Sequence, residues 1–216
     1  MNIIVIADKF QKRMKSKGCV GLIKINNRTN VIQNQFFTLR NFYPKAKIIY
    51  IYGFENKKFL SFINKNPALS ENIDYLYNEN YLTHNYAYSL YLAKNYLNDN
   101  TIILFGDHIL NPKIFENFDK NKGSQMFINK KQKNRLGCII HDNKIENISY
   151  DLDNYLSEIY YLSKSDSIKL QQIISNSIYH NYFIFELINK MIDQNIILSP
   201  FFIDNKVSNI SYKAIS

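Results

Sequence analysis

"TIILFGDHILNP", residues 101–112, is the stretch on which the fold prediction depends. Its first five residues form a continuous apolar run, which is typical of a strand covered on both faces of a sheet. Similar runs occupy residues 3–7 and 48–52, and longer segments of helical period separate the three. We therefore expect an α/β fold with a mostly parallel sheet and these three runs as its central strands.

The segments between these runs carry helical stripes of apolar residues. Asn30 is expected to cap the first helix. The apolar residues of that helix share one face: Ile32, Phe36, Leu39 and Tyr43. A second stripe precedes the third strand: Leu90, Ala93 and Leu97. Asn111-Pro112 predicts a short helix that runs through Phe118, because asparagine caps helices and proline is favoured in their first turn.

Shorter strands are expected in the second half of the chain, at residues 124–128, 136–140 and 144–149. Asp142-Asn143 joins the last two in a hairpin turn. A helix at 183–194 and a strand at 196–203 follow. The pattern predicts an antiparallel extension after the parallel half. Because there is no internal repeat or low-complexity linker, we expect one α/β domain over residues 1–216.

Composition narrows the classes of partner. The net charge of +9 suits an anionic ligand. The lysines are scattered along the chain instead of forming a basic helix or tail, which argues against nucleic-acid binding. The first apolar run is too short for a signal core or a membrane span, so we expect a cytoplasmic protein without a membrane partner. Cys19 and Cys138 lack disulfide or metal spacing and are interpreted as reduced thiols.

Two carboxylates are expected at strand ends. Asp107 follows the run at 101–105, and Asp204 follows the run at 196–203. Open α/β sheets bind ligands at the carboxyl ends of their strands, and Mg²⁺ prefers few protein carboxylates with many phosphate or water oxygens. The pair therefore indicates a Mg²⁺ ion beside a bound phosphate. Taken singly, each aspartate is also explained as a turn or capping residue.

The loop after the first strand is rich in positive charge. Five cations fall within nine residues: Lys9, Lys12, Arg13, Lys15 and Lys17. Such groups can neutralise a triphosphate, although Asp8 adds an opposing negative charge to the loop. A solvated basic loop without a ligand is the alternative. Among the histidines, His108 draws interest, because it follows Asp107 and could contact an acceptor or the water shell of a metal ion.

Two segments resemble those of a known family. They are YNENYLTHNYAYSLYLAKNYL, residues 77–97, and GDHILNPKIF, residues 106–115. Both look like parts of the small nucleotidyltransferases that activate phosphorylated alcohols, polyols and sugars. The bacterial phosphocholine cytidylyltransferases and the inositol-1-phosphate cytidylyltransferases are the most similar. The resemblance implies a single-domain, nucleotidyltransferase-like fold of the GT-A, Rossmann-related type, with a mixed, mostly parallel sheet flanked by helices.

The resemblance also implies roles for particular residues. Asp107 and Asp204 would bind a catalytic Mg²⁺ ion, and Arg13 would stabilise charge on the leaving pyrophosphate. Asn85 and Ser89 would lie near the nucleotide base. The nucleotide-binding set is completed by the first loop and the glycine before Asp107: Ala7, Lys9, Lys12, Arg13 and Gly106.

The implied reaction is Mg²⁺-dependent transfer of a nucleotidyl group, with cytidylyl favoured, from a nucleoside triphosphate to a small phosphorylated acceptor. CTP would be the donor, and pyrophosphate would be released. No general base is needed, because the attacking phosphate of the acceptor is already anionic. The sequence leaves the acceptor and the oligomeric state open.

The first loop departs from the family pattern Leu-Ala-Ala-Gly-x-Gly-x-Arg-(Leu or Met). Residues 6–14 align with that pattern without a gap, but Lys9 and Gln11 replace both glycines. Val20 stands where the family has a lysine. Glycines allow backbone N–H groups to approach phosphate oxygens closely, so their loss reshapes the loop.

This departure leaves an alternative open, namely a degenerate protein of the same fold that binds a nucleotide, a sugar phosphate or a protein partner without turnover. A glycosyltransferase is a weaker alternative. Such enzymes typically place Asp-x-Asp at the strand end where this chain has Gly-Asp-His, residues 106–108.

Overall fold

The computed structural model describes residues 1–10, 12–129, 136–203 and 207–209, except for the side chains of residues 12–14 and 209. The strands within these residues are β1 (Asn2–Ala7), β2 (Lys47–Tyr52), β3 (Ile73–Tyr77), β4 (Thr101–Phe105), β5 (His108–Leu110), β6 (Gln125–Asn129), β7 (Leu136–His141), β8 (Lys144–Tyr150), β9 (Tyr155–Leu162), β10 (Ser199–Phe202) and β11 (Val207–Asn209). The α-helices are α1 (Val31–Phe42), α2 (Asn56–Asn64), α3 (Tyr86–Leu92), α4 (Lys164–Ile174) and α5 (Ile184–Asp193). Short 3₁₀ helices include η1 (Lys12–Lys17) and η2 (Val20–Leu22).

The main sheet is mixed, and its central part is parallel. β1 lies between β2 and β4 and is parallel to both, and β3 extends this part beyond β2. On the other side, β9 pairs antiparallel with β4 and with β6, and β10 lies parallel to β6. The hairpin β7–β8 joins the sheet through β9. The predicted mixed, mostly parallel sheet with an antiparallel extension is confirmed.

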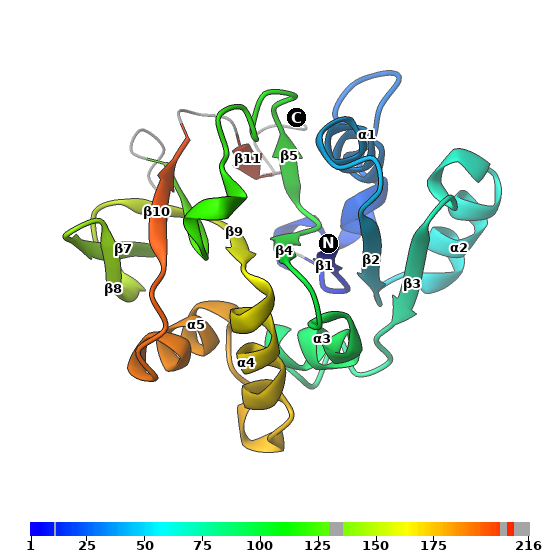
Figure 1. The fold of residues 1–216 in the computed structure, drawn as a ribbon. Coiled ribbons are helices and arrows are strands. Elements are labelled where there is room, and N and C mark those ends of the chain that lie inside the picture. The colour runs from blue at the N-terminus through cyan, green and yellow to red at the C-terminus, as the bar shows by residue number, and fades with distance from the viewer. Residues whose placement is uncertain (11, 130–135, 204–206, 210–216) are drawn as a thin grey trace.

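Helices cover both faces of the sheet, so the side chains of β1 alternate between two hydrophobic layers. Ile3 and Val5 pack in the layer that includes α1 and α2, whereas Ile4 and Ile6 pack in the layer of α3, α4 and α5. All four are at most 2% exposed. Figure 1 shows α3, α4 and α5 together along one side of the sheet and α1 on the other. In the described ranges, no helix combines the length and apolar character needed to cross a membrane.

Local signals in the sequence were accurate at two turns. The side chains of Asn30 and Gln33 each accept the backbone N–H of the other residue, so the predicted cap of α1 is a reciprocal capping box. Asp142 and Asn143 have φ angles of 47° and 59°, the positive values that a two-residue hairpin turn requires. Both features depend on neighbouring residues alone, and both predictions are confirmed.

The predicted helix at residues 112–118 is wrong. This segment forms successive turns, in which Ile114 and Glu116 donate their N–H groups to the carbonyl three residues earlier. The side chain of Asn111 does bond the first turn, as a cap would. However, Asn117 has a φ of 64°, a left-handed conformation that a right-handed helix cannot include. The segment is therefore too short to propagate as a helix.

The apolar pattern did not predict β3, α2, β9 or α4. In β3, an edge strand, Asp74 interrupts the apolar run and pairs with Lys47 at 2.7 Å. In β9, Glu158 has a φ of 54°, which breaks the regular alternation of side chains. The partners on neighbouring strands stabilise these two elements more than their own pattern does.

Candidate active site at the carboxyl ends of the central strands

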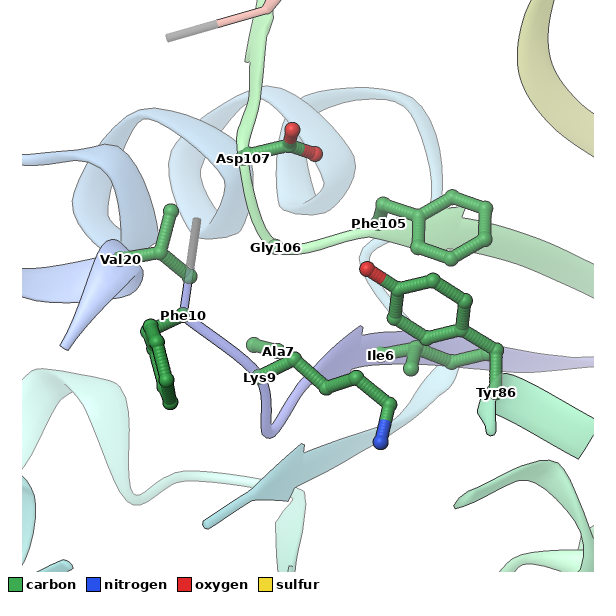
Figure 2. A pocket seen from close by; sticks show the side chains of 9 residues that line it. All are labelled: Ile6, Ala7, Lys9, Phe10, Val20, Tyr86, Phe105, Gly106 and Asp107. Carbon is green, nitrogen blue, oxygen red and sulfur yellow. The ribbon is translucent and has the colours of Figure 1, made fainter. Parts of the chain in front are cut away.

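A small pocket lies at the carboxyl ends of β1 and β4 (Figure 2). Its lining comprises Ile6, Ala7, Lys9, Phe10, Val20, Tyr86, Phe105, Gly106 and Asp107. The cavity volume of about 30 Å³ has room for about two water molecules. A nucleotide bound here would therefore extend beyond this pocket.

Gly106 allows the end of β4 to approach the end of β1. Its N–H donates to the carbonyl of Ile6 at 2.8 Å, and a Cβ atom added to it would lie 2.2 Å from the Cβ of Ala7. Asp107 comes directly afterwards, and its side chain is 21% exposed. Figure 2 shows its carboxylate projecting at the rim of the pocket. The predicted position of Asp107, at the carboxyl end of a central strand, agrees with the structure.

The remaining walls of the pocket are largely apolar. Phe10 packs against Phe54 with 4.8 Å between ring centroids, and Val20 is only 6% exposed. Tyr86 meets Phe105 edge to face at 4.9 Å, and its hydroxyl points toward the pocket (Figure 2). Burial raises the pKa of Tyr86, which keeps this hydroxyl protonated at neutral pH. Val20 stands where the family that the sequence resembles has a lysine, so this part of the wall is apolar.

His108 does not face the pocket as the sequence suggested. Its side chain is fully buried, with its ring 5.9 Å from that of Phe105. Among the described residues, neither ring nitrogen has a hydrogen-bond partner. Burial lowers the pKa of His108, so the neutral ring is favoured, although Asp107 has an opposing effect. Its Nε2 nevertheless lies 4.0 Å from Oδ1 of Asp107, and contact of His108 with an acceptor or with the water shell of a metal ion remains a prediction.

Three of the predicted functional groups lie outside the described residues: Asp204 and the side chains of Lys12 and Arg13. On either side of the gap at 204–206, the N–H of Ile203 bonds to the carbonyl of Ile128 and β11 pairs antiparallel with β5. In the described part of the chain, no three His, Cys, Asp or Glu side chains gather into a metal site. Asp107 is thus the carboxylate that the described residues place at the pocket.

Asp8 does not add charge to the mouth of the loop, as the sequence had suggested. It is fully buried, and its Oδ2 accepts hydrogen bonds from Asn78 Nδ2 at 2.6 Å and from Ser89 Oγ at 2.8 Å. Within the described residues its Oδ1 has no hydrogen-bond partner. Burial raises the pKa of Asp8, and the nearby Lys9 ammonium partly offsets this effect. The negative charge therefore lies beneath the loop.

Lys9 is also engaged within the protein. Its ammonium donates to the carbonyl of Tyr81 at 2.7 Å and to that of His84, and it lies 3.9 Å from the Asp8 carboxylate. The side chain is 18% exposed, and burial lowers its pKa. In Figure 2 the ammonium points away from Asp107. The predicted contact between Lys9 and a phosphate remains a prediction, and it would require these bonds to break.

The two residues expected near the base have structural partners as well. The side chain of Asn85 caps α3 by accepting the N–H of Tyr86 at 3.1 Å, and its amide donates to the carbonyl of Asn181. Ser89 is fully buried on α3, where its hydroxyl donates to Asp8. Asn85 is the more accessible of the two, and the role of both at the base remains a prediction.

Sequence reasoning missed Asn78 and Tyr81, which lie in the loop between β3 and α3. Asn78 is fully buried, donates to Asp8, and accepts the N–H of Asn80 through its Oδ1 at 2.9 Å. Tyr81 provides a carbonyl to Lys9. Asn78 follows β3 directly, but that strand was itself not predicted, so the sequence offered no signal for Asn78. No sequence signal indicates a backbone carbonyl as a partner.

Because the carboxyl group of Asp8 is buried, the free energies of unfolding of the parent protein and of Asp8→Asn should differ by an amount that changes with pH. The pKa of Asp8 is raised above 3.8, so the folded state holds a proton that the unfolded state releases. The stability that this proton contributes is present below 3.8 and is lost as pH rises through the folded pKa. Urea unfolding across that range should show the variant gaining stability relative to the parent. A constant difference would contradict the raised pKa.

Comparisons with known proteins identify the fold. No family profile and no curated protein sequence matches the chain. Among solved structures, the CTP:phosphocholine cytidylyltransferase from Streptococcus pneumoniae superposes on it with a TM-score of 0.78 at 20% identity. The match covers 99% of this chain and 94% of that one. The chain has the nucleotidyltransferase fold.

Two further structures support this identification of the fold. The inositol-1-phosphate CTP transferase from T. maritima has a TM-score of 0.78 at 17% identity, over 100% of this chain and 91% of that one. A nucleoside-diphosphate-sugar pyrophosphorylase from Vibrio cholerae has a TM-score of 0.77 at 11% identity, over 97% and 95% of the two chains. The resemblance to the cytidylyltransferases is thus confirmed at the level of the nucleotidyltransferase fold.

Proposed function

We propose that this protein transfers a nucleotidyl group, with cytidylyl favoured, from a nucleoside triphosphate to a small phosphorylated acceptor. A phosphate oxygen of the acceptor attacks the α-phosphorus of the triphosphate. The bond from the α-phosphorus to the oxygen that bridges it to the β-phosphorus breaks as the new bond forms. Pyrophosphate leaves with that electron pair. The acceptor oxygen is anionic before it attacks, so the reaction needs no general base.

The position of Asp107 is the observation that carries this proposal. It is a partly exposed carboxylate directly after a central parallel strand, beside a pocket that the loop after β1 helps to line. Ligands of open α/β sheets bind at this edge. The names of the S. pneumoniae and T. maritima enzymes describe transfer from CTP to phosphocholine and to inositol 1-phosphate. These names favour CTP as the donor and a phosphorylated alcohol as the acceptor.

The residues at the pocket fit a Mg²⁺ ion. Mg²⁺ is held by one or two carboxylates, with phosphate and water oxygens completing its shell, and Asp107, at a rim open to solvent, would be such a ligand. We propose Asp204 as the second carboxylate. This assignment rests on the family resemblance, because β11 pairs with β5 in a register that puts Asn209 opposite His108 and Val207 opposite Leu110. When bound, the ion would neutralise charge on the phosphates that react.

The chain itself would contribute orientation and positive charge. We propose that Arg13 stabilises charge on the leaving pyrophosphate and that Lys12 assists it, as members of a lysine-rich 3₁₀ helix at the loop after β1. Ala7 and Gly106 meet where β1 and β4 end, so they determine how closely the triphosphate can approach the sheet. Asn85, at the start of α3, would face the base.

A screen of donors and acceptors tests the proposed reaction. The protein would be incubated with Mg²⁺, each of the four common nucleoside triphosphates, and acceptors that include phosphocholine, inositol 1-phosphate and glucose 1-phosphate. Pyrophosphate release would be measured with each acceptor and without any acceptor. We expect release that depends on both substrates, with CTP the best donor. Binding of a triphosphate without release in any combination would contradict the transferase proposal.

One observation favours a second candidate, which is a non-catalytic binding protein of this fold. The pocket is small and largely apolar, with Phe10, Val20 and Tyr86 in its walls. Calorimetric titration with CTP and Mg²⁺, followed by product analysis, separates the two candidates. Heat of binding with no pyrophosphate would support the binding protein, whereas turnover with any acceptor would exclude it.

A further inference from the structure

Two adjacent residues after β1 tie that strand to the loop that joins β3 and α3, residues 78–85. Asp8 accepts hydrogen bonds from the side chain of Asn78, at the start of this loop, and from that of Ser89, on α3. Lys9 donates to two backbone carbonyls within the loop. We call this pair of residues the Asp8–Lys9 clasp. Asp8 and Lys9 stand where the family that the sequence resembles has alanine and glycine. Neither of those residues has a side chain that could make these contacts.

We propose that Lys9 is a positioning residue that acts through the 78–85 loop and does not bind the phosphate chain of the donor. The clasp fixes this loop before any nucleotide binds. The loop leads directly into α3, whose first residue, Tyr86, lines the pocket and whose cap, Asn85, is proposed to face the base. The expected effect of Lys9 on nucleotide affinity rests on the proposed function, whereas its expected effect on the 78–85 loop does not.

The charge balance of the clasp argues against release of Lys9 to a phosphate. Asp8 is fully buried, and among the described residues Lys9 is the cation that lies close enough to affect its pKa. Removing one member of a buried charged pair leaves the other without compensation, which is strongly unfavourable. The ammonium also points away from Asp107, as Figure 2 shows. Moving it to the phosphate side would break both carbonyl bonds and isolate the carboxylate.

The end of β2 reinforces the same arrangement. The N–H of Phe54 donates to the carbonyl of Asp8 at 2.9 Å, and the N–H of Asn78 donates to that of Tyr52 at 2.8 Å. Between them lies Gly53, where an added Cβ atom would come within 2.7 Å of the Asp8 carbonyl oxygen and 2.9 Å of the Tyr81 Cβ. The loops after β1, β2 and β3 are therefore in direct contact around Gly53, with no room for an added methyl group.

Lys9→Met tests the inference, because it keeps the length of the side chain and removes its charge and donors. Lys9→Arg, which can still donate to carbonyls, is the conservative variant. Lys57→Met, an exposed lysine on α2, is the matched control for a change of charge. Amide hydrogen exchange would be measured without ligand, and the binding of CTP with Mg²⁺ would be compared with that of inorganic tripolyphosphate, which has no base or ribose.

In Lys9→Met, we expect exchange at Thr83 and His84, whose N–H groups bond to the carbonyl of Asn80, to become at least about tenfold faster. CTP should bind about tenfold more weakly, while tripolyphosphate binds with unchanged affinity. Lys9→Arg and Lys57→Met should behave like the parent. If Lys9→Met does not fold, Lys9→Gln, which keeps one donor group, should show an intermediate acceleration of exchange.

Other results would overturn the inference. Unchanged exchange in the 78–85 loop, together with equal weakening of CTP and tripolyphosphate, would identify Lys9 as a phosphate ligand. Faster exchange with unchanged CTP affinity would show that the clasp orders the loop but has no effect on nucleotide binding. The exchange measurement needs no nucleotide, so failure of the parent protein to bind CTP would contradict the proposed function and leave the test of the clasp intact.

Discussion

Asp107→Ala is expected to lower Mg²⁺-dependent pyrophosphate release by at least about 100-fold, because it removes the charged group that would hold the metal against the reacting phosphates. The side chain is 21% exposed and lies at the end of β4, so its loss should leave no large cavity. The unfolding midpoint should therefore change little. Initial rates at saturating CTP, acceptor and Mg²⁺ would measure the effect.

Two controls make this result specific. Asp107→Asn keeps the shape of the side chain and removes its charge, so it should lose nearly as much activity as the alanine variant. Glu146→Ala removes a carboxylate that is 54% exposed on β8, in the hairpin, and should retain the parent rate. Parent-like turnover in both Asp107 variants would eliminate the proposed mechanism.

Gly106→Ala is expected to destabilise the fold by about 1–3 kcal/mol or more, because the new methyl group has no space. Its Cβ would lie 2.2 Å from the Cβ and 2.8 Å from the Cα of Ala7, so the backbone at the end of β1 or β4 must move. The displacement would also separate Asp107 from the loop after β1. Urea unfolding would measure the loss of stability, and pyrophosphate release would measure the loss of activity.

A double-mutant cycle with Ala7→Gly isolates the steric cause. Removing the methyl group of Ala7 alone should cost about 0.5–1 kcal/mol, since glycine weakens a strand. In the double variant the two methyl groups no longer collide, so the combined loss should be smaller than the sum of the single losses. The contact with the Ala7 Cα remains, and the rescue should be partial. Simple additivity would show that Gly106 is required for another reason.

Most of the central sheet and the position of Asp107 could be predicted from sequence, because the signals involved are local. A run such as residues 101–105 shows burial on both faces through its own composition, and the strand end that follows it is then known. The cap at Asn30 and the turn at Asp142 likewise depend on residues within a few positions. By contrast, β9 was missed, because its irregular residue Glu158 obscures the alternation of side chains.

The Asp8–Lys9 clasp could not be predicted, because its partners are far along the chain. Asp8 lies 70 residues from Asn78 and 81 from Ser89, and Lys9 lies 72 residues from Tyr81. A cluster of charges in sequence indicates an anion site only if the charges face solvent. In the folded protein Lys9 points toward backbone carbonyls, and the pattern of charges in the sequence does not indicate this direction.

By itself, the sequence determined the strands β1, β2 and β4, the helices α1 and α5, and the carboxylate that follows β4. Each of these depends on periodicity, capping or composition within one segment. Only the tertiary structure decided that Asp8 and His108 are buried, that Lys9 binds the 78–85 loop, and that the pocket is small. The physical reason is desolvation, because burial and its effect on a charge depend on which distant segments pack around the group.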